Sequence, residues 1–189
     1  APHAPYTVSD NTLSNIFTFA NQLDLPIHMH LHETCEEIAS SIDDFGIRPI
    51  ERLQKLNLLG PNLIAVHMVH LTNEEINLLK VHNCNVIHCP SSNMKLASGI
   101  APIVDLVNQS INVAIGTDGA ASNNRLDMFE EMRLTALLGK VTRGAQALPT
   151  HQILQMATLN GAIALGIEKQ TGSLTVGKAA DITAIDFSD

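Results

Sequence analysis

Residues 25–33 read Leu-Pro-Ile-His-Met-His-Leu-His-Glu, and this stretch decides the fold. Apolar residues alternate with histidines over a length that suits one buried β-strand. The alternation places His28, His30 and His32 on one face of the strand. Glu33 then lies on the opposite face or in the loop that follows. A histidine in an apolar strand is more often a hydrogen-bonded core residue than a metal ligand, so this strand alone leaves both interpretations open.

Strand and helix patterns alternate along the rest of the chain. Further strands are predicted over residues 63–70, 86–89 and 111–117. Helices are predicted over residues 11–23, 48–58, 73–81, 102–108, 126–138 and 151–165. This order is typical of an α/β protein with a parallel sheet and covering helices. A dinucleotide-binding sheet would need a glycine-rich turn after its first strand, and that turn is absent from the sequence.

One glycine-rich stretch, residues 172–178, has the spacing of a phosphate-binding P-loop. Ala179 stands where Ser or Thr would hold magnesium, and an alternating, strand-like run, Asp181–Phe187, follows instead of a helix. We therefore predict a turn here and a strand after it.

Composition narrows the class of protein. The chain is 45% hydrophobic and 16% charged, which is ordinary for a globular protein. Its net charge of −8 argues against nucleic-acid binding, and no apolar run reaches the roughly 18 residues that a membrane span requires. The 3 cysteines suit a reducing compartment better than a disulfide scaffold. We expect a cytoplasmic protein that binds neither nucleic acid nor membrane.

The predicted strands end in residues that can bind a metal or transfer a proton. The first strand ends with His30 and Glu33, and the later ones end with His67, His88 and Asp118. The carboxyl ends of the strands meet on one face of a (β/α)8 barrel. Histidine and aspartate supply nitrogen and oxygen ligands that suit zinc or iron. Four strand ends of this kind favour a metal centre over isolated core histidines.

Other sites are absent or less favoured. The cytidine-deaminase zinc pattern, the metalloprotease His-Glu-x-x-His helix and the Gly-x-Ser-x-Gly elbow do not occur in the sequence. We interpret Cys84 and Cys89 as buried structural thiols. We interpret His70, His82 and His151 as structural residues too.

Five ordered motifs resemble a known family. They are residues 2–6 (Pro-His-Ala-Pro-Tyr), 30–34 (His-Leu-His-Glu-Thr), 66–70 (Val-His-Met-Val-His), 88–96 (His-Cys-Pro-Ser-Ser-Asn-Met-Lys-Leu) and 116–124 (Gly-Thr-Asp-Gly-Ala-Ala-Ser-Asn-Asn). Together they resemble the amidohydrolase superfamily of metal-dependent hydrolases. Within it they resemble the 5-methylthioadenosine/S-adenosylhomocysteine deaminase group, which neighbours the triazine chlorohydrolases. The resemblance covers essentially the whole chain.

The resemblance implies a fold. Residues 1–170 are expected to form the C-terminal part of a (β/α)8 TIM-like barrel, from the end of strand four through strand eight. Residues 171–189 are expected to give a terminal strand of a small β-domain. The family's His-x-His pair on the first barrel strand is absent from this chain. We therefore expect the chain to be part of a protein roughly two to three times its size, with an incomplete metal site and little activity of its own.

The resemblance also implies roles for individual residues. His30 and Asp118 are expected to bind one divalent metal, with zinc preferred and iron as the alternative. Glu33 is expected to pass a proton to the ring nitrogen of the substrate. His67 is expected to orient the attacking water or to stabilise charge on it.

The implied reaction is the deamination of an adenine nucleoside. Hydroxide supplied by the metal attacks the carbon that carries the exocyclic amine, and Glu33 protonates the adjacent ring nitrogen. Ammonia then leaves with help from Glu33 and Asp118. His3 and Ser122 are expected to contact the purine nucleoside, which is the expected small-molecule partner.

Two alternatives stay open. The first keeps the fold but changes the reaction, to another purine deaminase or to a triazine-type chlorohydrolase. Glu33 favours deamination, because a poor leaving group needs a proton donor more than chloride does. The second alternative is a catalytically inactive barrel that only binds a ligand, and the retained His30, Glu33, His67 and Asp118 speak against it. The sequence leaves the oligomeric state open, a homo-oligomer included.

Overall fold

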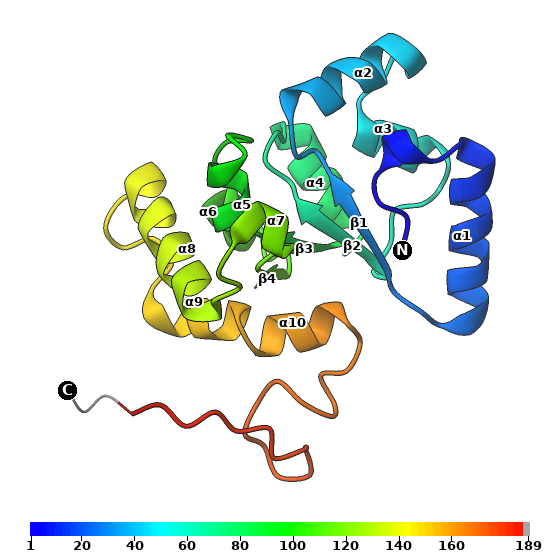
Figure 1. The fold of residues 1–189 in the computed structure, drawn as a ribbon. Helices are drawn as coiled ribbons and strands as arrows, with labels where there is room; N and C mark the ends of the chain where they lie inside the picture. Colours follow the sequence, from blue (N-terminus) through cyan, green and yellow to red (C-terminus); the bar gives the residue numbers. More distant parts are fainter. Residues whose placement is uncertain (187–189) are drawn as a thin grey trace.

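The computed structural model describes residues 1–186, and its centre is a four-stranded parallel sheet in the order β1-β2-β3-β4 (Figure 1). The strands are β1 (Ile27–Leu31), β2 (Leu63–His67), β3 (Asn85–His88) and β4 (Val113–Ile115). Neighbouring strands are consecutive in the sequence, and every pair is parallel. The predicted parallel α/β sheet is therefore confirmed.

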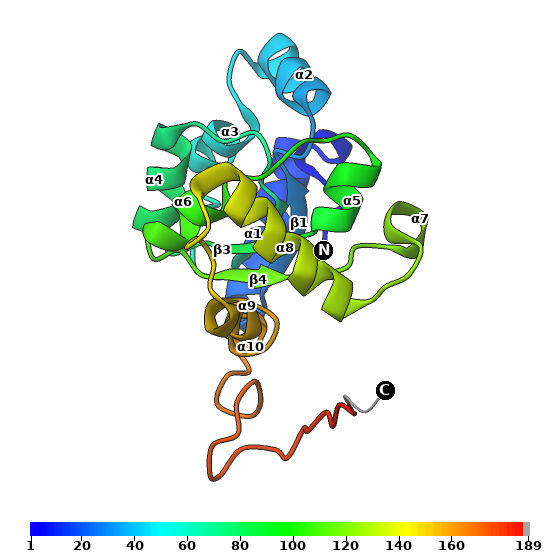
Figure 2. The same cartoon turned by 90° about the vertical axis from the view of Figure 1, so that its left-hand side faces the viewer.

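Helices connect the strands and cover them. They are the 3-10 helix η1 (Pro5–Thr7) and the α-helices α1 (Asp10–Leu23), α2 (Cys35–Phe45), α3 (Pro49–Lys55), α4 (Asn73–Val81), α5 (Pro90–Lys95), α6 (Ile103–Asn108), α7 (Ala120–Asn123), α8 (Met128–Arg143), α9 (Thr150–Met156) and α10 (Leu159–Ala164). Figures 1 and 2 both show α10 beneath the strands, with the C-terminal tail extending away below it. Most of the predicted helices are present with shifted ends.

The hydrophobic core lies between the sheet and its helices. On β1 the apolar side chains of Ile27, Met29 and Leu31 are buried in this core. The alternating residues differ, because His28 is exposed and His30 is half-buried. Period-2 alternation therefore sends the apolar residues toward the helices and these two histidines to the other face of the sheet.

Two helical segments differ from the sequence prediction. Helix α2 was not predicted, although Thr34 and Glu37 match the capping-box pattern and the Thr34 hydroxyl accepts a hydrogen bond from the Glu37 amide at 3.1 Å. The single helix predicted over residues 151–165 is two helices, α9 and α10. The backbone at Thr158 (φ −133°, ψ −90°) is not helical and separates them. An apolar periodicity can continue across such a break, which explains the error.

The tail, residues 166–186, contains no helix or strand. The turn predicted over residues 172–178 is confirmed, since the Lys178 amide donates to the Thr175 carbonyl at 3.1 Å. The strand expected over Asp181–Phe187 is not formed in residues 181–186, because no other strand lies alongside to pair with it. Phe187 lies outside the described residues. The assignment of residues 171–189 to a small β-domain stays a prediction.

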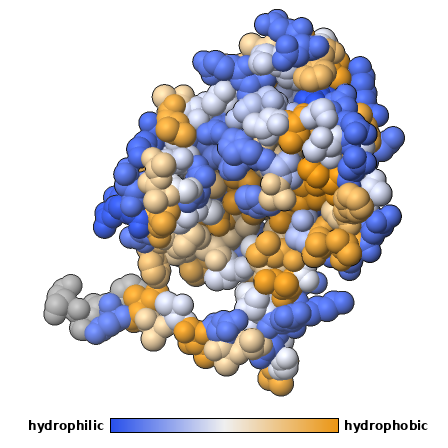
Figure 3. Space-filling model, turned by 45° about the vertical axis from the view of Figure 1, so that its right-hand side comes forward, coloured by the Kyte–Doolittle hydropathy of each residue, from blue (hydrophilic) through white to orange (hydrophobic). Residues whose placement is uncertain are grey.

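The surface carries both polar and apolar side chains. None of the helices within residues 1–186 combines the length and apolar character needed to cross a bilayer. Large apolar side chains are exposed near the end of α1, at Phe19, Leu23 and Leu25. Figure 3 shows apolar side chains gathered on the lower half of one face of the molecule.

Candidate metal centre and catalytic site

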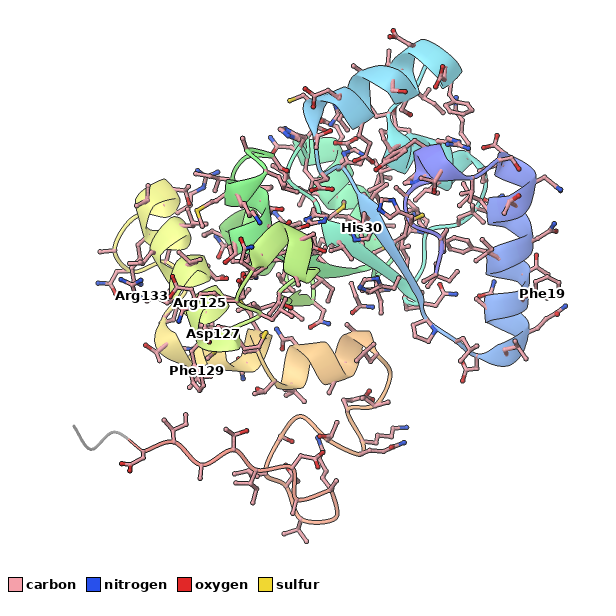
Figure 4. All side chains as sticks on the ribbon, viewed as in Figure 1. Phe19, His30, Arg125, Asp127, Phe129 and Arg133 are labelled. Atoms are coloured by element: carbon pink, nitrogen blue, oxygen red, sulfur yellow. The ribbon has the colours of Figure 1, made fainter. Side chains whose placement is uncertain are left out.

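Three side chains from three strand ends converge on one point. They are His30 on β1, His67 at the end of β2 and Asp118 in the loop after β4, and their ligand atoms all lie within 4.8 Å of one another. The rings of His30 and His67 are stacked, with centroids 5.3 Å apart. Figure 4 labels His30, which lies on β1 near the centre of the molecule. The predicted pair of His30 and Asp118 is thus brought together, and His67 joins it.

The N-terminal segment holds His30 in place. The carbonyl of His3 accepts two hydrogen bonds from His30, from the backbone amide at 2.9 Å and from the ring Nδ1 at 2.8 Å. Because a carbonyl can only accept, Nδ1 carries the proton and the Nε2 lone pair is left for another partner. The His3 ring lies 4.7 Å from the His30 ring, so this predicted residue is also at the site.

His67 leaves the regular geometry of its strand. Alternation would place it on the helix-facing side, with Leu63 and Ala65. Instead the backbone is left-handed at His67 (φ 75°) and Met68 (φ 49°), and the imidazole stacks on His30. Such a backbone costs of order 1–3 kcal/mol at a non-glycine residue and is common at functional sites. Burial lowers the pKa of His67, which favours the neutral ring.

Asp118 is held as a carboxylate. Its Oδ2 accepts a hydrogen bond from the Ser92 hydroxyl at 2.6 Å, and its Oδ1 accepts one from the Gly119 amide at 2.7 Å. Burial alone would raise the pKa of Asp118, but these hydrogen bonds, the nearby His67 and a hydrogen bond from Ser122 lower it below its ordinary value. Ser122 is therefore close to the cluster, and its contact with the substrate stays a prediction.

The carboxyl group of Glu33 lies beside this cluster. Its Oε2 is 3.6 Å from Nε2 of His67, and its Oε1 accepts a hydrogen bond from the Ser98 hydroxyl at 3.4 Å. The Glu33 backbone is fixed from the other side, because its amide donates to Oε2 of Glu37 at 2.7 Å. Glu33 is thus a half-buried acid whose carboxyl group faces the site.

A buried glutamate on α8 links two parts of the site. Glu131 is fully buried, and its Oε2 accepts a hydrogen bond from the Ser91 amide at 3.1 Å, while its Oε1 accepts one from Asn123 Nδ2 at 2.6 Å. Ser91 lies in the first turn of α5, the helix that carries Ser92, and Asn123 is the last residue of α7, the short helix that follows Asp118. Sequence reasoning missed Glu131, because most glutamates on a helix are exposed.

His32 does not share a face with His28 and His30, so that prediction was wrong. β1 ends one residue earlier, and the backbone of His32 is left-handed (φ 54°). Its buried ring accepts a hydrogen bond at Nε2 from the Ile50 amide at 3.0 Å and donates from Nδ1 to the His70 carbonyl at 3.0 Å. His32 therefore joins the segments around it and does not reach the metal cluster.

The strand-end histidines His70 and His88 are not among the three residues whose ligand atoms converge. His70 donates from Nε2 to a backbone carbonyl at 2.8 Å, as expected of a structural histidine. His88 is buried, its Nδ1 has no hydrogen-bond partner within residues 1–186, and burial together with His67 lowers its pKa to about 3. Cys84 and Cys89 are buried thiols, as predicted.

Comparison with known proteins agrees with this geometry. The sequence profile of the "Amidohydrolase family" matches residues 1–189. The chain is 53% identical over 189 residues to a 5-methylthioadenosine/S-adenosylhomocysteine deaminase from Teredinibacter turnerae, and the match covers 100% of this chain and 43% of that protein. The chain therefore spans less than half the length of this relative.

Solved structures show the same similarity. An adenosine deaminase from Xanthomonas campestris with bound zinc matches with a TM-score of 0.93 and 51% identity, over 95% of this chain and 41% of that one. An atrazine chlorohydrolase from Arthrobacter aurescens complexed with zinc matches with a TM-score of 0.86 and 26% identity, over 91% of this chain and 38% of that one.

Proposed function

Because the chain belongs to the amidohydrolase family, we propose that the protein carrying it is a metal-dependent aminohydrolase that deaminates an adenine nucleoside. The substrate class is 5′-methylthioadenosine and S-adenosylhomocysteine, the compounds named for the Teredinibacter relative. One observation carries the proposal: the Glu33 carboxyl lies 3.6 Å from the His67 ring, beside the cluster of His30 and Asp118. An acid at this distance can exchange protons with whatever the cluster binds.

The cluster fits a divalent metal. His30 directs its Nε2 lone pair away from the His3 carbonyl, and Asp118 is kept ionised by its hydrogen bonds, so a nitrogen and an oxygen ligand are available. We assign His30 and Asp118 as ligands, with zinc preferred over iron because zinc accompanies both matching structures. When bound, the metal supplies Lewis-acid chemistry that lowers the pKa of water.

The chain's own residues would divide the proton transfers. Nε2 of His67 accepts a hydrogen bond from the attacking water and holds it in line with the ring carbon. Glu33 takes up a proton from this water and gives it to the ring nitrogen next to the carbon that bears the amine. Asp118 accepts the hydroxyl proton of the adduct, and this proton passes to the amine, which leaves as ammonia.

His3 and Ser122 are proposed as substrate contacts. The His3 ring is exposed and tilted over His30, with centroids 4.7 Å apart, so a nucleoside at the cluster would lie within its reach. Ser122 hydrogen-bonds Asp118 from α7 and is half-buried, which leaves its hydroxyl close to the same space.

Deamination is favoured over chloride displacement by two observations. Identity to the two deaminases is 53% and 51%, against 26% to the atrazine chlorohydrolase. An amine is also a poor leaving group that needs a proton, and Glu33 provides one.

The test supplies four compounds, one at a time, to the zinc-loaded, intact protein. They are 5′-methylthioadenosine, S-adenosylhomocysteine, guanine and a chlorotriazine. Ammonia and chloride are measured in parallel. We expect ammonia from the first two compounds. Ammonia from guanine alone, or chloride from the triazine alone, would overturn the proposed substrate class. If none of the four compounds yields ammonia or chloride, the proposed activity is refuted.

A further inference from the structure

Helix α5 lies at the site, and Asn93 faces the ring of His67. The helix begins directly after β3, with Pro90 at its first position, and the Asn93 amide donates to the Cys89 carbonyl at 3.0 Å. The Asn93 side chain is 1% exposed, and its Oδ1 lies 2.8 Å from Nδ1 of His67. No solvent competes for this hydrogen bond.

The two ends of the Asn93 amide are used unequally. Its Oδ1 pairs with His67, whereas its buried Nδ2 has no hydrogen-bond partner within residues 1–186. A buried donor without a partner is destabilising, and native proteins usually avoid one. The arrangement therefore points to a role for the oxygen, since hydrophobic packing alone would be served better by an apolar residue of the same size.

The oxygen determines where His67 carries its proton. A carbonyl oxygen only accepts, so a hydrogen bond to Asn93 Oδ1 requires the proton on Nδ1 of His67. The Nε2 atom then has a lone pair, and it is this atom that lies 3.6 Å from the Glu33 carboxyl. The opposite tautomer would direct an N–H into the cluster and remove the acceptor that an attacking water needs.

We propose that Asn93 is a positioning residue that fixes His67 in the Nδ1–H tautomer, through the 2.8 Å hydrogen bond between Asn93 Oδ1 and His67 Nδ1. The importance of Asn93 for turnover rests on the proposed function, but the assignment of the His67 tautomer does not. The same turn of α5 also positions Asp118, because the Ser92 hydroxyl donates a hydrogen bond to its carboxylate at 2.6 Å. The anchoring of Ser91 to the buried Glu131 fixes this turn.

The test measures the tautomer directly. Nitrogen-15 NMR of histidine-labelled, metal-free intact protein distinguishes a protonated Nδ1 from a protonated Nε2, and the signals of His67 are those lost in His67→Gln. We expect the Nδ1–H form in the wild type and in Asn93→Asp, which keeps an oxygen acceptor. Asn93→Leu has a similar volume and no acceptor, and we expect the Nε2–H form to appear in it.

Activity supplies the second readout. Loss of a hydrogen-bonding partner of this kind typically costs about 10- to 100-fold in activity, so we expect that loss in Asn93→Leu and partial recovery in Asn93→Asp. Ser91→Ala is the matched control on the same turn. Ser91 binds Glu131 through its backbone amide, which the substitution keeps, so we expect the wild-type tautomer of His67 in this variant.

Two results would overturn the proposal: an Nε2–H ring in the wild type, or an unchanged Nδ1–H ring in a folded Asn93→Leu. If Asn93→Leu does not fold, the wild-type spectrum still decides. A wild-type protein that shows the Nδ1–H ring but no turnover would contradict the proposed function and leave the assignment of Asn93 intact.

Discussion

The buried His88 predicts how stability depends on pH. Its pKa falls from 6.5 to about 3 on folding, because burial disfavours the charged ring and His67 adds to the effect. As the pH falls below 6.5, the unfolded chain takes up a proton that the folded protein cannot accept. The free energy of unfolding therefore decreases by about 1.4 kcal/mol per pH unit, and this loss ends only near the folded pKa of about 3. Between about pH 7.5 and about pH 5 the loss attributable to His88 is about 2 kcal/mol.

The assay is urea unfolding of the wild type and of His88→Asn at both pH values. Other histidines contribute to the wild-type pH dependence, so the informative quantity is the difference between the two proteins. We expect this difference to shift by about 2 kcal/mol in favour of His88→Asn at the lower pH. Val86→Ala is the control, because it removes buried apolar volume from the same strand without a titratable group. Parallel pH profiles for the wild type and His88→Asn would refute the reasoning.

Two further substitutions test the packing around the site. Glu131→Ala leaves the Ser91 amide and the Asn123 side chain without their acceptor, and we expect a loss of about 2–4 kcal/mol in urea unfolding; a loss below about 1 kcal/mol would show that water replaces the carboxylate. Gly139→Ala places a Cβ 2.6 Å from Cδ1 and 3.1 Å from Cγ of Leu148, and we expect a net loss of about 1 kcal/mol because overpacking exceeds the gain in helix propensity. A higher melting temperature for Gly139→Ala would contradict this.

The sequence was sufficient for features that depend on local patterns. The alternation around His30 predicted a buried strand, and the apolar spacing over residues 73–81 predicted α4 with the bounds that it has. The order of strands and helices then predicted the parallel sheet. It also predicted that His30 and Asp118 would lie together, since the carboxyl ends of parallel strands share one edge.

Features that depend on single backbone turns could not be predicted. Regular alternation counted His32 with His30, but a left-handed residue turns His32 into the surrounding protein. A similar turn at His67 has the opposite effect and brings its ring to the cluster. Periodicity assumes an unbroken strand, so it fails at the strand end, which is where the site lies.

The buried partners of the site also escaped sequence reasoning. Ser92, Asn93 and Glu131 are polar residues that ordinarily face solvent, and only their burial and hydrogen bonds reveal their roles. Asn93 belongs to one of the motifs that resemble the family, yet the motif gives no reason for an asparagine at this position. That reason comes from the distance between its oxygen and His67.

The central claim is that Glu33 transfers the proton during deamination. It is tested most directly by the rate of ammonia release from 5′-methylthioadenosine by the intact, zinc-loaded protein and two variants. Glu33→Gln removes the acid beside the cluster and keeps its shape, and Glu36→Gln makes the same change at an exposed residue on α2. We predict a loss of at least about 100-fold for Glu33→Gln, since proton transfer by a positioned side chain contributes about that much or more, and near wild-type turnover for Glu36→Gln. Unchanged turnover in Glu33→Gln would contradict the account, because the proton would then reach the ring nitrogen by another route.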